Sequence, residues 1–477
     1  MRTPQIADVL LLQNRVGLVA APFVFGDRLN HPPATPPSMA TRPSACPGLL
    51  RIVHALDGGI CRVKLAGGQL HSQQARAIAE AASHCASGVL ELTNRSNLQI
   101  RGVRSGCENT LIAQLLDAGL GPRNLAADDV RNLMLSPAAG LDRAALWDTR
   151  LLATQILALL ENTPELHALS PKFALQLDGG ESLAMLQHPH DLWLSAPPDQ
   201  PKWLAFGLAG SPSDPALAAV PIEHGLDLVH GVLSVFLQLA GPGQNRMRQL
   251  LSSLPVAAFV EHLQARLPFP LRRDQAVSHW RRTEVPCRAP IGSIAQQQAG
   301  LQMVAAAARL GRVSANQLLA LADLAEQYGD ASLRLTPWQG LLLPNIPSAA
   351  ADAVLQALAE IGLLTDAREP LGNLIACTGS TGCAKGLTDS KADALQLAER
   401  LRASTARPQV HISACPRSCA AAHTAPFTLL ASSNDHYQLY QRMPGVAGFG
   451  QLLVAAMTID EAGDWFAAHC ATGNSDA

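Results

Sequence analysis

Two distant stretches of the chain share one order of hydrophobic and polar positions. In residues 68–101 and 311–343, apolar residues first recur at helical spacing, as at Leu318 and Leu321, which predicts a helix. Apolar and polar residues then alternate on both sides of a short break, which predicts strands. Each stretch therefore predicts a helix, a short strand, a tight turn and a second strand.

The two stretches also align residue by residue. When Gly68 is placed on Gly311, these pairs follow without a gap: Gln74 with Gln317, Ala79 with Ala322, Leu92 with Leu335, and Thr93 with Thr336. The alternative is that short helices rich in alanine and leucine align by chance. We favour an internal repeat, which predicts two related halves that each pair two α+β pieces.

The similarity extends beyond the aligned stretches. Residues 132–134 match residues 373–375, so that Ser136 falls on Cys377. A helix is predicted after each of these segments, over 143–160 in the first half and over 390–402 in the second. Between the halves, residues 226–267 are predicted to be mostly helical, with a break at residues 241–243, and to pack outside the halves or to bridge them.

Composition narrows the class of protein. The chain has 477 residues, 48% hydrophobic residues and a formal net charge of -2, which excludes a disordered or fibrous protein. The balanced charge predicts neither a nucleic-acid partner nor a membrane partner, so any anion site must be local. No apolar run reaches the roughly 18 residues of a membrane span. The run 16–26 only faintly resembles an export signal, so we expect a cytoplasmic protein.

Four of the ten cysteines form a cluster in the sequence. Cys377 and Cys383 stand in a C-x5-C pattern, and Cys415 and Cys419 stand in a C-x3-C pattern. Two turns that bring four thiolates together can hold a [4Fe–4S] cube, and the glycines among them let the backbone approach inorganic sulfide. A zinc site fits less well because its cysteine pairs have shorter spacing. Disulfides or buried thiols are the third interpretation.

The other cysteines are scattered and are predicted to be small buried hydrophobic residues: Cys46, Cys61, Cys85, Cys107, Cys287 and Cys470. The histidines His54, His84, His411 and His423 are expected to be structural, because no spacing of two histidines and one carboxylate is found. Gly241-Pro242-Gly243 follows a helical run instead of a strand, so we find no dinucleotide fingerprint.

These cysteine patterns, placed behind a duplicated α+β unit, resemble the nitrite/sulfite reductase family over about residues 46–470. The resemblance is carried by the two cysteine segments and by LDGGICRVKL at 56–65, LTNRSNLQIRGV at 92–103, SPKFALQLDGG at 170–180 and RLTPWQGLLLPNI at 334–346. The stretches ACPGLLRI at 45–52 and SPAAGLD at 136–142 are most similar to one branch of the family, the precorrin-3B synthases of cobalamin biosynthesis.

The resemblance implies an α+β fold that is internally duplicated, with two pseudo-equivalent halves that each contain a ferredoxin-like unit and an α/β unit. The expected segments are a flexible N-terminal leader at 1–45, a first ferredoxin-like half domain at 46–130, a first α/β domain with a helical bridge at 131–285, a second ferredoxin-like half domain at 286–347, and a second α/β domain with the [4Fe–4S] cluster at 348–477.

The resemblance also assigns a basic pocket for an acidic tetrapyrrole. Its predicted substrate-binding residues are Arg95, Gln99, Arg101, Arg131 and Lys172. Forked guanidinium donors suit the carboxylate arms of such a ring. Arg95, Gln99 and Arg101 alternate in sequence and are expected to face one side of a strand. The alternative for each arginine is a solvated surface residue.

The chain departs from the reductase pattern at two places. The reductases carry a second lysine two residues after the first, where this chain has Ala174. Without that ammonium group, proton donation to a small oxyanion is harder to achieve. In the second copy of the repeat, Arg95 is replaced by Trp338, which Gln339 follows; the roles of both residues are left open.

The synthase resemblance implies an oxygen-dependent hydroxylation of precorrin-3A at C20, with formation of a γ-lactone from the ring A acetate. The implied cofactors and partners are the [4Fe–4S] cluster, dioxygen, a separate electron-donor protein fed by NADH, and a mononuclear non-haem iron for which no ligands are found. Two alternatives remain: a sirohaem-dependent sulfite or nitrite reductase, and a non-catalytic scaffold in which the metal only staples the second half.

Overall fold

The computed structural model describes residues 46–200, 202–283, 289–421, 425–443, 446 and 448–470. The predicted leader at 1–45, Cys287 and His423 lie outside these ranges. Among the described residues, no helix has both the length and the apolar composition that crossing a membrane requires.

The fold confirms the internal repeat. The first ferredoxin-like unit contains β1 (Val53–Ala55), β2 (Gly58–Val63), β3 (Gln69–His71), α1 (Ser72–Cys85), β4 (Val89–Leu92), β5 (Leu98–Val103) and α2 (Glu108–Asp117). The second contains β11 (Gly292–Ala295), β12 (Leu301–Ala307), β13 (Arg312–Ser314), α8 (Ala315–Tyr328), β14 (Ser332–Leu335), β15 (Gly340–Pro347) and α9 (Ala351–Glu360). The tight turn of each copy places one residue in the left-handed region, Ser96 at φ 56° and Gln339 at φ 60°.

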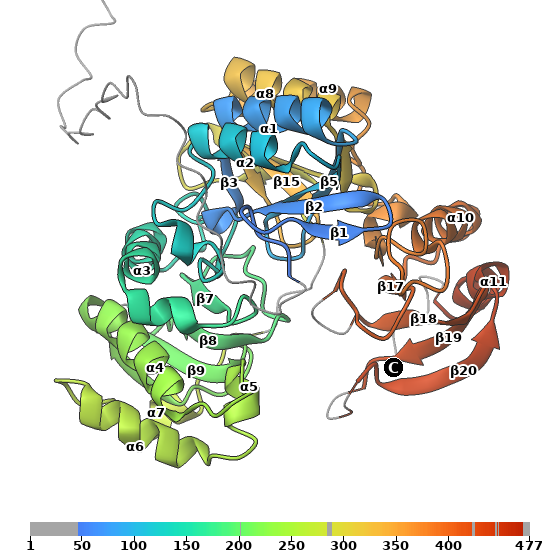
Figure 1. The fold of residues 1–477 in the computed structure, drawn as a ribbon. Helices are drawn as coiled ribbons and strands as arrows, with labels where there is room; N and C mark the ends of the chain where they lie inside the picture. Colours follow the sequence, from blue (N-terminus) through green and yellow to red (C-terminus); the bar gives the residue numbers. More distant parts are fainter. Residues whose placement is uncertain are drawn as a thin grey trace, which may run out of the picture. The chain divides into compact units, whose positions relative to one another are not determined.

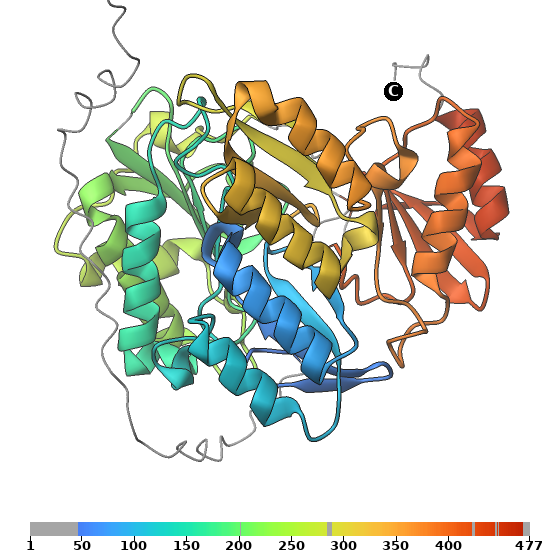
Figure 2. The same ribbon diagram turned by 90° about the horizontal axis from the view of Figure 1, so that it is seen from above.

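The two ferredoxin-like units exchange a strand. The first sheet has the order β1-β2-β5-β4-β13, and the second has the order β11-β12-β15-β14-β3. Val313 of the second half pairs with Leu90, and Leu70 of the first half pairs with Leu333. Helices α1 and α8 lie side by side over the sheets (Figure 2), and side chains of both units form one hydrophobic core. The two units therefore share a core although they are separate along the sequence.

Each half continues into an α/β unit. The first contains β6 (Leu133–Leu135), α3 (Arg150–Asn162), β7 (Leu175–Asp178), β8 (His190–Ser195), β9 (Trp203–Gly210) and β10 (Ala218–Pro221). The second contains β16 (Leu374–Ala376), α10 (Ser390–Arg402), β17 (Val410–Ser413), β18 (Phe427–Ser433), β19 (His436–Gln441), β20 (Gln451–Met457) and α11 (Ile459–His469). In both sheets the first three strands run parallel and the remaining neighbours pair antiparallel.

Two helix predictions need adjustment. Helix α10 has the predicted bounds, but α3 begins at Arg150 instead of residue 143. The intervening residues form turns, in which the amide of Ala144 donates to Asp142 and the amide of Leu146 donates to the carbonyl of Gly179. Asp142 therefore stabilises a turn at the point where the apolar pattern indicates a helix.

The segment between the halves is helical, as predicted, and covers the first α/β sheet (Figure 1). It contains α4 (Gly225–Leu239), α5 (Met247–Leu250), α6 (Val256–Arg266) and α7 (Gln275–Ser278). Phe236 and Phe259 join the core beneath this sheet. Short 3-10 helices complete the described elements: Ala66–Gly68, Leu125–Ala127, Pro164–Ala168, Ile222–His224, Arg309–Gly311, Ser348–Ala350 and Pro370–Asn373.

Candidate functional site

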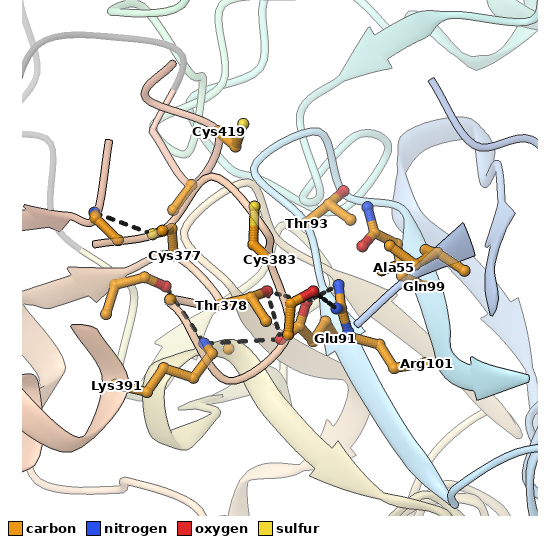
Figure 3. Close-up of a pocket in the computed structure, with 18 of the residues that line it drawn as sticks. Ala55, Glu91, Thr93, Gln99, Arg101, Cys377, Thr378, Cys383, Lys391 and Cys419 are labelled. Carbon is orange, nitrogen blue, oxygen red and sulfur yellow. Dashed lines mark hydrogen bonds and ion pairs between the residues drawn. The ribbon is translucent and has the colours of Figure 1, made fainter. Parts of the chain in front are cut away.

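The four clustered cysteines line one cavity of about 580 Å³, which we call the cysteine cavity. Cys377 directly follows β16, and Cys415 follows β17 after one intervening residue. The carboxyl ends of neighbouring parallel strands meet at one sheet edge, which brings the two cysteine segments together. Cys383 and Cys419 extend from the loops that follow (Figure 3).

The loop around Cys377 has little space for side chains. Gly379 has φ 75°, and a Cβ atom there would lie 2.8 Å from the Ser390 amide nitrogen. A Cβ atom on Gly382 would lie 2.5 Å from the side chain of Thr378. The Cys377 sulfur accepts a hydrogen bond from the Ala414 amide at 3.3 Å. The glycines therefore let the loop fold tightly and keep backbone donors close to sulfur.

The thiols lie close enough together to affect one another electrostatically. Burial raises the pKa of Cys419, and the neighbouring thiols of Cys415, Cys377 and Cys383 raise that pKa further. Four thiolates in this space would repel one another unless a positively charged iron–sulfur core lay among them. The donor set therefore fits a [4Fe–4S] cluster, which would supply one-electron transfer when bound.

The arrangement fits a single metal ion less well. In the described part of the chain, no group of three or more histidine, cysteine or acidic side chains is placed to ligate one metal ion. The four cysteines line one cavity of about 580 Å³, which is roomier than a single ion needs. The same observation leaves the predicted mononuclear iron without a ligand set among the described residues, so this iron stays a prediction.

Arg95 and Arg131 line a second, smaller cavity together with Asn97, Asn132, Ala174 and His190; we call it the arginine cavity. Burial, together with the nearby charges of Arg246 and Arg62, lowers the pKa of Arg95 to about 10. The Nε and Nη2 atoms of Arg131 are buried without a hydrogen-bond partner among the described residues. The Nη1 atom of Arg131 lies 3.7 Å from Glu161 Oε1, so Arg131 already has one acidic partner. The cavity measures about 10 Å³, which is room for about one water molecule, so a carboxylate could reach the unpaired donors only if the surrounding side chains moved.

The predicted substrate-binding residues do not all lie together. Arg95 belongs to the turn before β5 and lines the arginine cavity, so the expectation that it faces the same side of a strand as Gln99 and Arg101 is wrong. Gln99 and Arg101 lie on β5 and line the cysteine cavity. Lys172 is exposed and lines neither of these cavities.

Arg101 already has carboxylate partners. Its Nε and Nη2 atoms donate to Asp57 at 2.8 and 2.7 Å, and its Nη1 atom lies 3.4 Å from Glu91. Its side chain is 5% exposed. Substrate binding by Arg101 stays a prediction, but a substrate carboxylate would have to compete with these two acids.

Sequence reasoning missed Arg62 and His190. The amide oxygen of Gln99, in the orientation that satisfies its hydrogen bonds, accepts from Arg62 Nη2 at 2.6 Å. Burial lowers the pKa of Arg62, which also lines the cysteine cavity. Arg62 and Gln99 are register partners on β2 and β5, so only the strand pairing relates them.

His190 lies beside Ala174 in the arginine cavity. Its Nδ1 atom is 2.9 Å from the His188 carbonyl oxygen. Burial lowers the pKa of His190 to about 3, and the positive charge of Arg95 contributes to this shift. The imidazole is therefore neutral at physiological pH, so the cavity holds fixed guanidinium charges and a neutral ring. Among the histidines singled out from the sequence, His54 lines the cysteine cavity, His84 is exposed and His411 is buried.

Comparison with known proteins identifies the family. The nitrite/sulfite reductase ferredoxin-like half domain matches residues 55–118 and 294–361. The nitrite and sulphite reductase 4Fe-4S domain matches residues 126–271, which is the α/β unit without the clustered cysteines. The chain belongs to the nitrite and sulfite reductase family, a family of oxidoreductases.

Individual relatives support this membership. A chloroplastic ferredoxin–nitrite reductase of Zea mays is 30% identical over 394 residues, which cover 77% of this chain and 68% of that protein. A ferredoxin-dependent sulfite reductase of Mycobacterium tuberculosis is 26% identical over 440 residues, which cover 85% and 77%. The solved structure of the Mycobacterium tuberculosis NirA protein shares the fold, with a TM-score of 0.73, 24% identity and coverage of 87% and 82%.

Proposed function

We propose that this protein is a [4Fe–4S] oxidoreductase that binds an acidic tetrapyrrole beside its cluster. The observation that carries the proposal is that neighbouring residues of one turn line both cavities. Thr93 and Asn94 line the cysteine cavity, while Arg95 and Asn97 line the arginine cavity. A carboxylate of a ring bound next to the cluster could reach the buried guanidinium groups of Arg95 and Arg131.

Within this class, we propose the oxygen-dependent hydroxylation of precorrin-3A at C20. The cavity contributes Ala174 and neutral His190 at the place where the reductase pattern has a second lysine. A site with fixed arginine charges and no ammonium group can anchor a carboxylate without protonating it. This favours an acidic ring as the substrate over a small oxyanion that must be protonated during reduction.

The proposed reaction balances as a monooxygenation. One oxygen atom of dioxygen is inserted at C20, and the ring A acetate closes the γ-lactone. The other oxygen atom leaves as water. It takes up two electrons, which NADH supplies through an electron-donor protein, and two protons, one released by NADH and one from the solvent. In this scheme Arg95 and Arg131 hold carboxylates and fix which face of the ring is exposed to oxygen.

The electron donor is proposed to approach next to Cys419. This cysteine is exposed, and the exposed residues Lys385 and Arg417 line the same cavity. A basic rim suits an acidic redox protein, because opposite charges speed the encounter. The names of the Zea mays and Mycobacterium tuberculosis relatives specify ferredoxin, so a ferredoxin is the donor class to test first.

A second candidate is a sirohaem-dependent nitrite or sulfite reductase. The relatives named above are nitrite and sulfite reductases, so the comparisons favour this candidate over the synthase. The composition of the arginine cavity around Ala174 favours the synthase. Both candidates use the cluster and an acidic tetrapyrrole, and they differ in whether that ring is a substrate or a resident cofactor.

One preparation separates the candidates. The protein is purified without oxygen, its iron and sulfide are assayed, and its visible and EPR spectra are recorded. About four irons and four sulfides without sirohaem bands, followed by turnover of precorrin-3A only when dioxygen is admitted, would support the synthase. Bound sirohaem and reduction of nitrite or sulfite would establish the reductase. A protein that cannot be reconstituted with iron and sulfide would overturn the proposed cluster. The remaining candidate would then be a non-catalytic scaffold in which metal binding only stabilises the second half.

A further inference from the structure

Glu91 of the first half contacts four side chains around the cysteine cavity. Its carboxylate accepts from Arg312 Nε at 3.0 Å and lies 3.4 Å from Arg101 Nη1 and 3.9 Å from Lys391 Nζ. The hydroxyl of Thr378 donates to both carboxylate oxygens at 3.4 Å. The Glu91 side chain is 13% exposed. Figure 3 shows Glu91 next to Arg101, Thr378 and Lys391.

These contacts join elements that are far apart in sequence. Glu91 lies on β4, Arg312 on the exchanged strand β13, and Lys391 on α10. Thr378 directly follows Cys377 in the loop Cys377–Cys383. The carboxylate of Glu91 therefore connects the first ferredoxin-like sheet to the loop that carries two cysteines.

Asn94, in the turn after β4, holds the other cysteine segment. Its side-chain amide donates to the carbonyl oxygens of Cys419 at 3.4 Å and Ala420 at 3.2 Å. The end of β4 and its turn therefore contact both cysteine segments of the opposite half. Glu91 differs from Asn94 in that it also brings a negative charge to the cavity wall.

The internal repeat provides a comparison within the same chain. In the gapless alignment, Glu91 corresponds to Arg334. In the later match of residues 132–134 with 373–375, which is shifted by two residues, Thr378 corresponds to Pro137. Arg334 is 6% exposed, and its Nη1 atom lies 3.5 Å from the Pro137 carbonyl oxygen. The same position therefore contacts the equivalent loop in both halves, but it carries a carboxylate only where that loop bears cysteines.

We propose that Glu91 is a positioning residue for the cluster, which anchors the Cys377–Cys383 loop to the first half and lowers the reduction potential of the cluster. The inference rests on the proposed [4Fe–4S] cofactor. A negative charge on the cavity wall disfavours the extra electron of the reduced cluster, while hydrogen bonds and buried charges around the sulfurs set its potential. Arg101, Arg312 and Lys391 hold the carboxylate in place and offset part of its charge.

The test compares Glu91→Gln with wild type in the anaerobically purified full-length protein. Glutamine keeps the size and the hydrogen-bond acceptor for Thr378 but removes the charge. We expect the iron content to be retained and the midpoint potential, measured by EPR-monitored redox titration, to shift upward. Glu80→Gln is the matched control, because Glu80 is exposed on α1 and should leave the potential unchanged.

The Arg312→Gln variant removes a positive charge that contacts Glu91, so it should shift the midpoint potential in the opposite direction. Arg312 contacts Glu91 but does not line the cysteine cavity, and its side chain is 36% exposed. We expect a smaller, downward shift of the midpoint potential, because solvent screens this charge. This variant also decides the matter if Glu91→Gln fails to fold: a downward shift would support the proposal and an unchanged potential would overturn it.

The remaining outcomes are distinct. A folded Glu91→Gln variant that loses iron, while Glu80→Gln keeps it, would overturn the proposal in this form, because glutamine keeps the hydrogen-bond acceptor that anchors Thr378. An intact cluster with the wild-type potential in Glu91→Gln would overturn the proposal. A wild-type protein without a reconstitutable cluster would instead overturn the proposed cofactor, which the iron and sulfide assay shows before any variant is made.

Discussion

Arg95 and Gln99 belong to one turn and strand, yet they line two different cavities. The turn reverses at Ser96, whose φ is 56°, so that Arg95 reaches the arginine cavity while Gln99 stays on β5 beside the cysteines. A ligand that spans both cavities would contact both side chains. The two residues therefore mark the path along which a macrocycle bound next to the cluster could extend a carboxylate.

Replacing Arg95 with alanine is expected to weaken tetrapyrrole binding and to spare the cluster. A hydrogen bond to a charged group contributes about 1.5–3 kcal/mol, which corresponds to a loss of about 10- to 100-fold in affinity. Titration with precorrin-3A in the absence of oxygen measures the loss. Arg248→Ala, at an exposed position on α5, is the control. Equal affinity in Arg95→Ala and wild type would refute the assignment.

Replacing Cys383 with serine is expected to abolish the cluster. Four cysteines line the cavity, and a cube bound through three of them loses one iron ligand and becomes labile. Iron and sulfide assays with an EPR spectrum after anaerobic reconstitution measure the loss. Cys470→Ser is the control, since Cys470 follows α11 and does not line the cavity. A full [4Fe–4S] signal in Cys383→Ser would contradict the ligand role.

Glu181 is expected to make the free energy of unfolding depend on pH. Burial, together with the charge of the neighbouring Asp178, raises the pKa of Glu181 from 4.5 to about 8. The unfolded chain releases this proton near the ordinary pKa, while the folded chain holds it until about pH 8. The unfolded state therefore binds fewer protons in this window, and stability falls as the pH rises through it.

Glu181→Gln removes this contribution. Relative to wild type, the variant is expected to gain stability as the pH rises from 5 to 8, by at most about 1.4 kcal/mol per pH unit. Urea unfolding at a series of pH values measures the difference. Glu165→Gln, at an exposed site, should show the wild-type slope. Parallel profiles for wild type and Glu181→Gln would argue against a protonated Glu181 in the folded state.

Leu70→Ala is expected to destabilise both ferredoxin-like sheets. Leu70 is fully buried on β3, which belongs to the second sheet although it comes from the first half. Removing a leucine side chain from a core costs about 2–5 kcal/mol. Because the core is shared, hydrogen exchange should accelerate in β2 and β5 as well as in β12 and β15. Leu151→Ala is the control, since Leu151 on α3 is 72% exposed. Acceleration confined to one sheet would contradict a shared core.

Much of this protein can be predicted from the sequence, because the evidence is local or repeated. Helical spacing and alternation predict α8, β14 and β15, and the gapless alignment predicts the same elements in the first half. The cysteine patterns predict which thiols share a site, since two short loops after parallel strands need no long-range information. Family membership rests on the two half domains and on residues 126–271, and these matches do not include the cysteine segments.

Only the tertiary structure decides which residues of different strands meet. The exchange of β3 and β13 depends on pairing between segments far apart in sequence, such as Leu70 with Leu333, which no local pattern encodes. Glu91 lies on β4 of the first half and Thr378 lies in the cysteine loop of the second half, so their contact depends on how the two halves pack together. Arg95 leaves the face of β5 because of the turn at Ser96. The sequence by itself determined the elements, the repeat and the cluster ligands to test, whereas the fold decided the partners and charges around them, because those depend on contacts between distant parts of the chain.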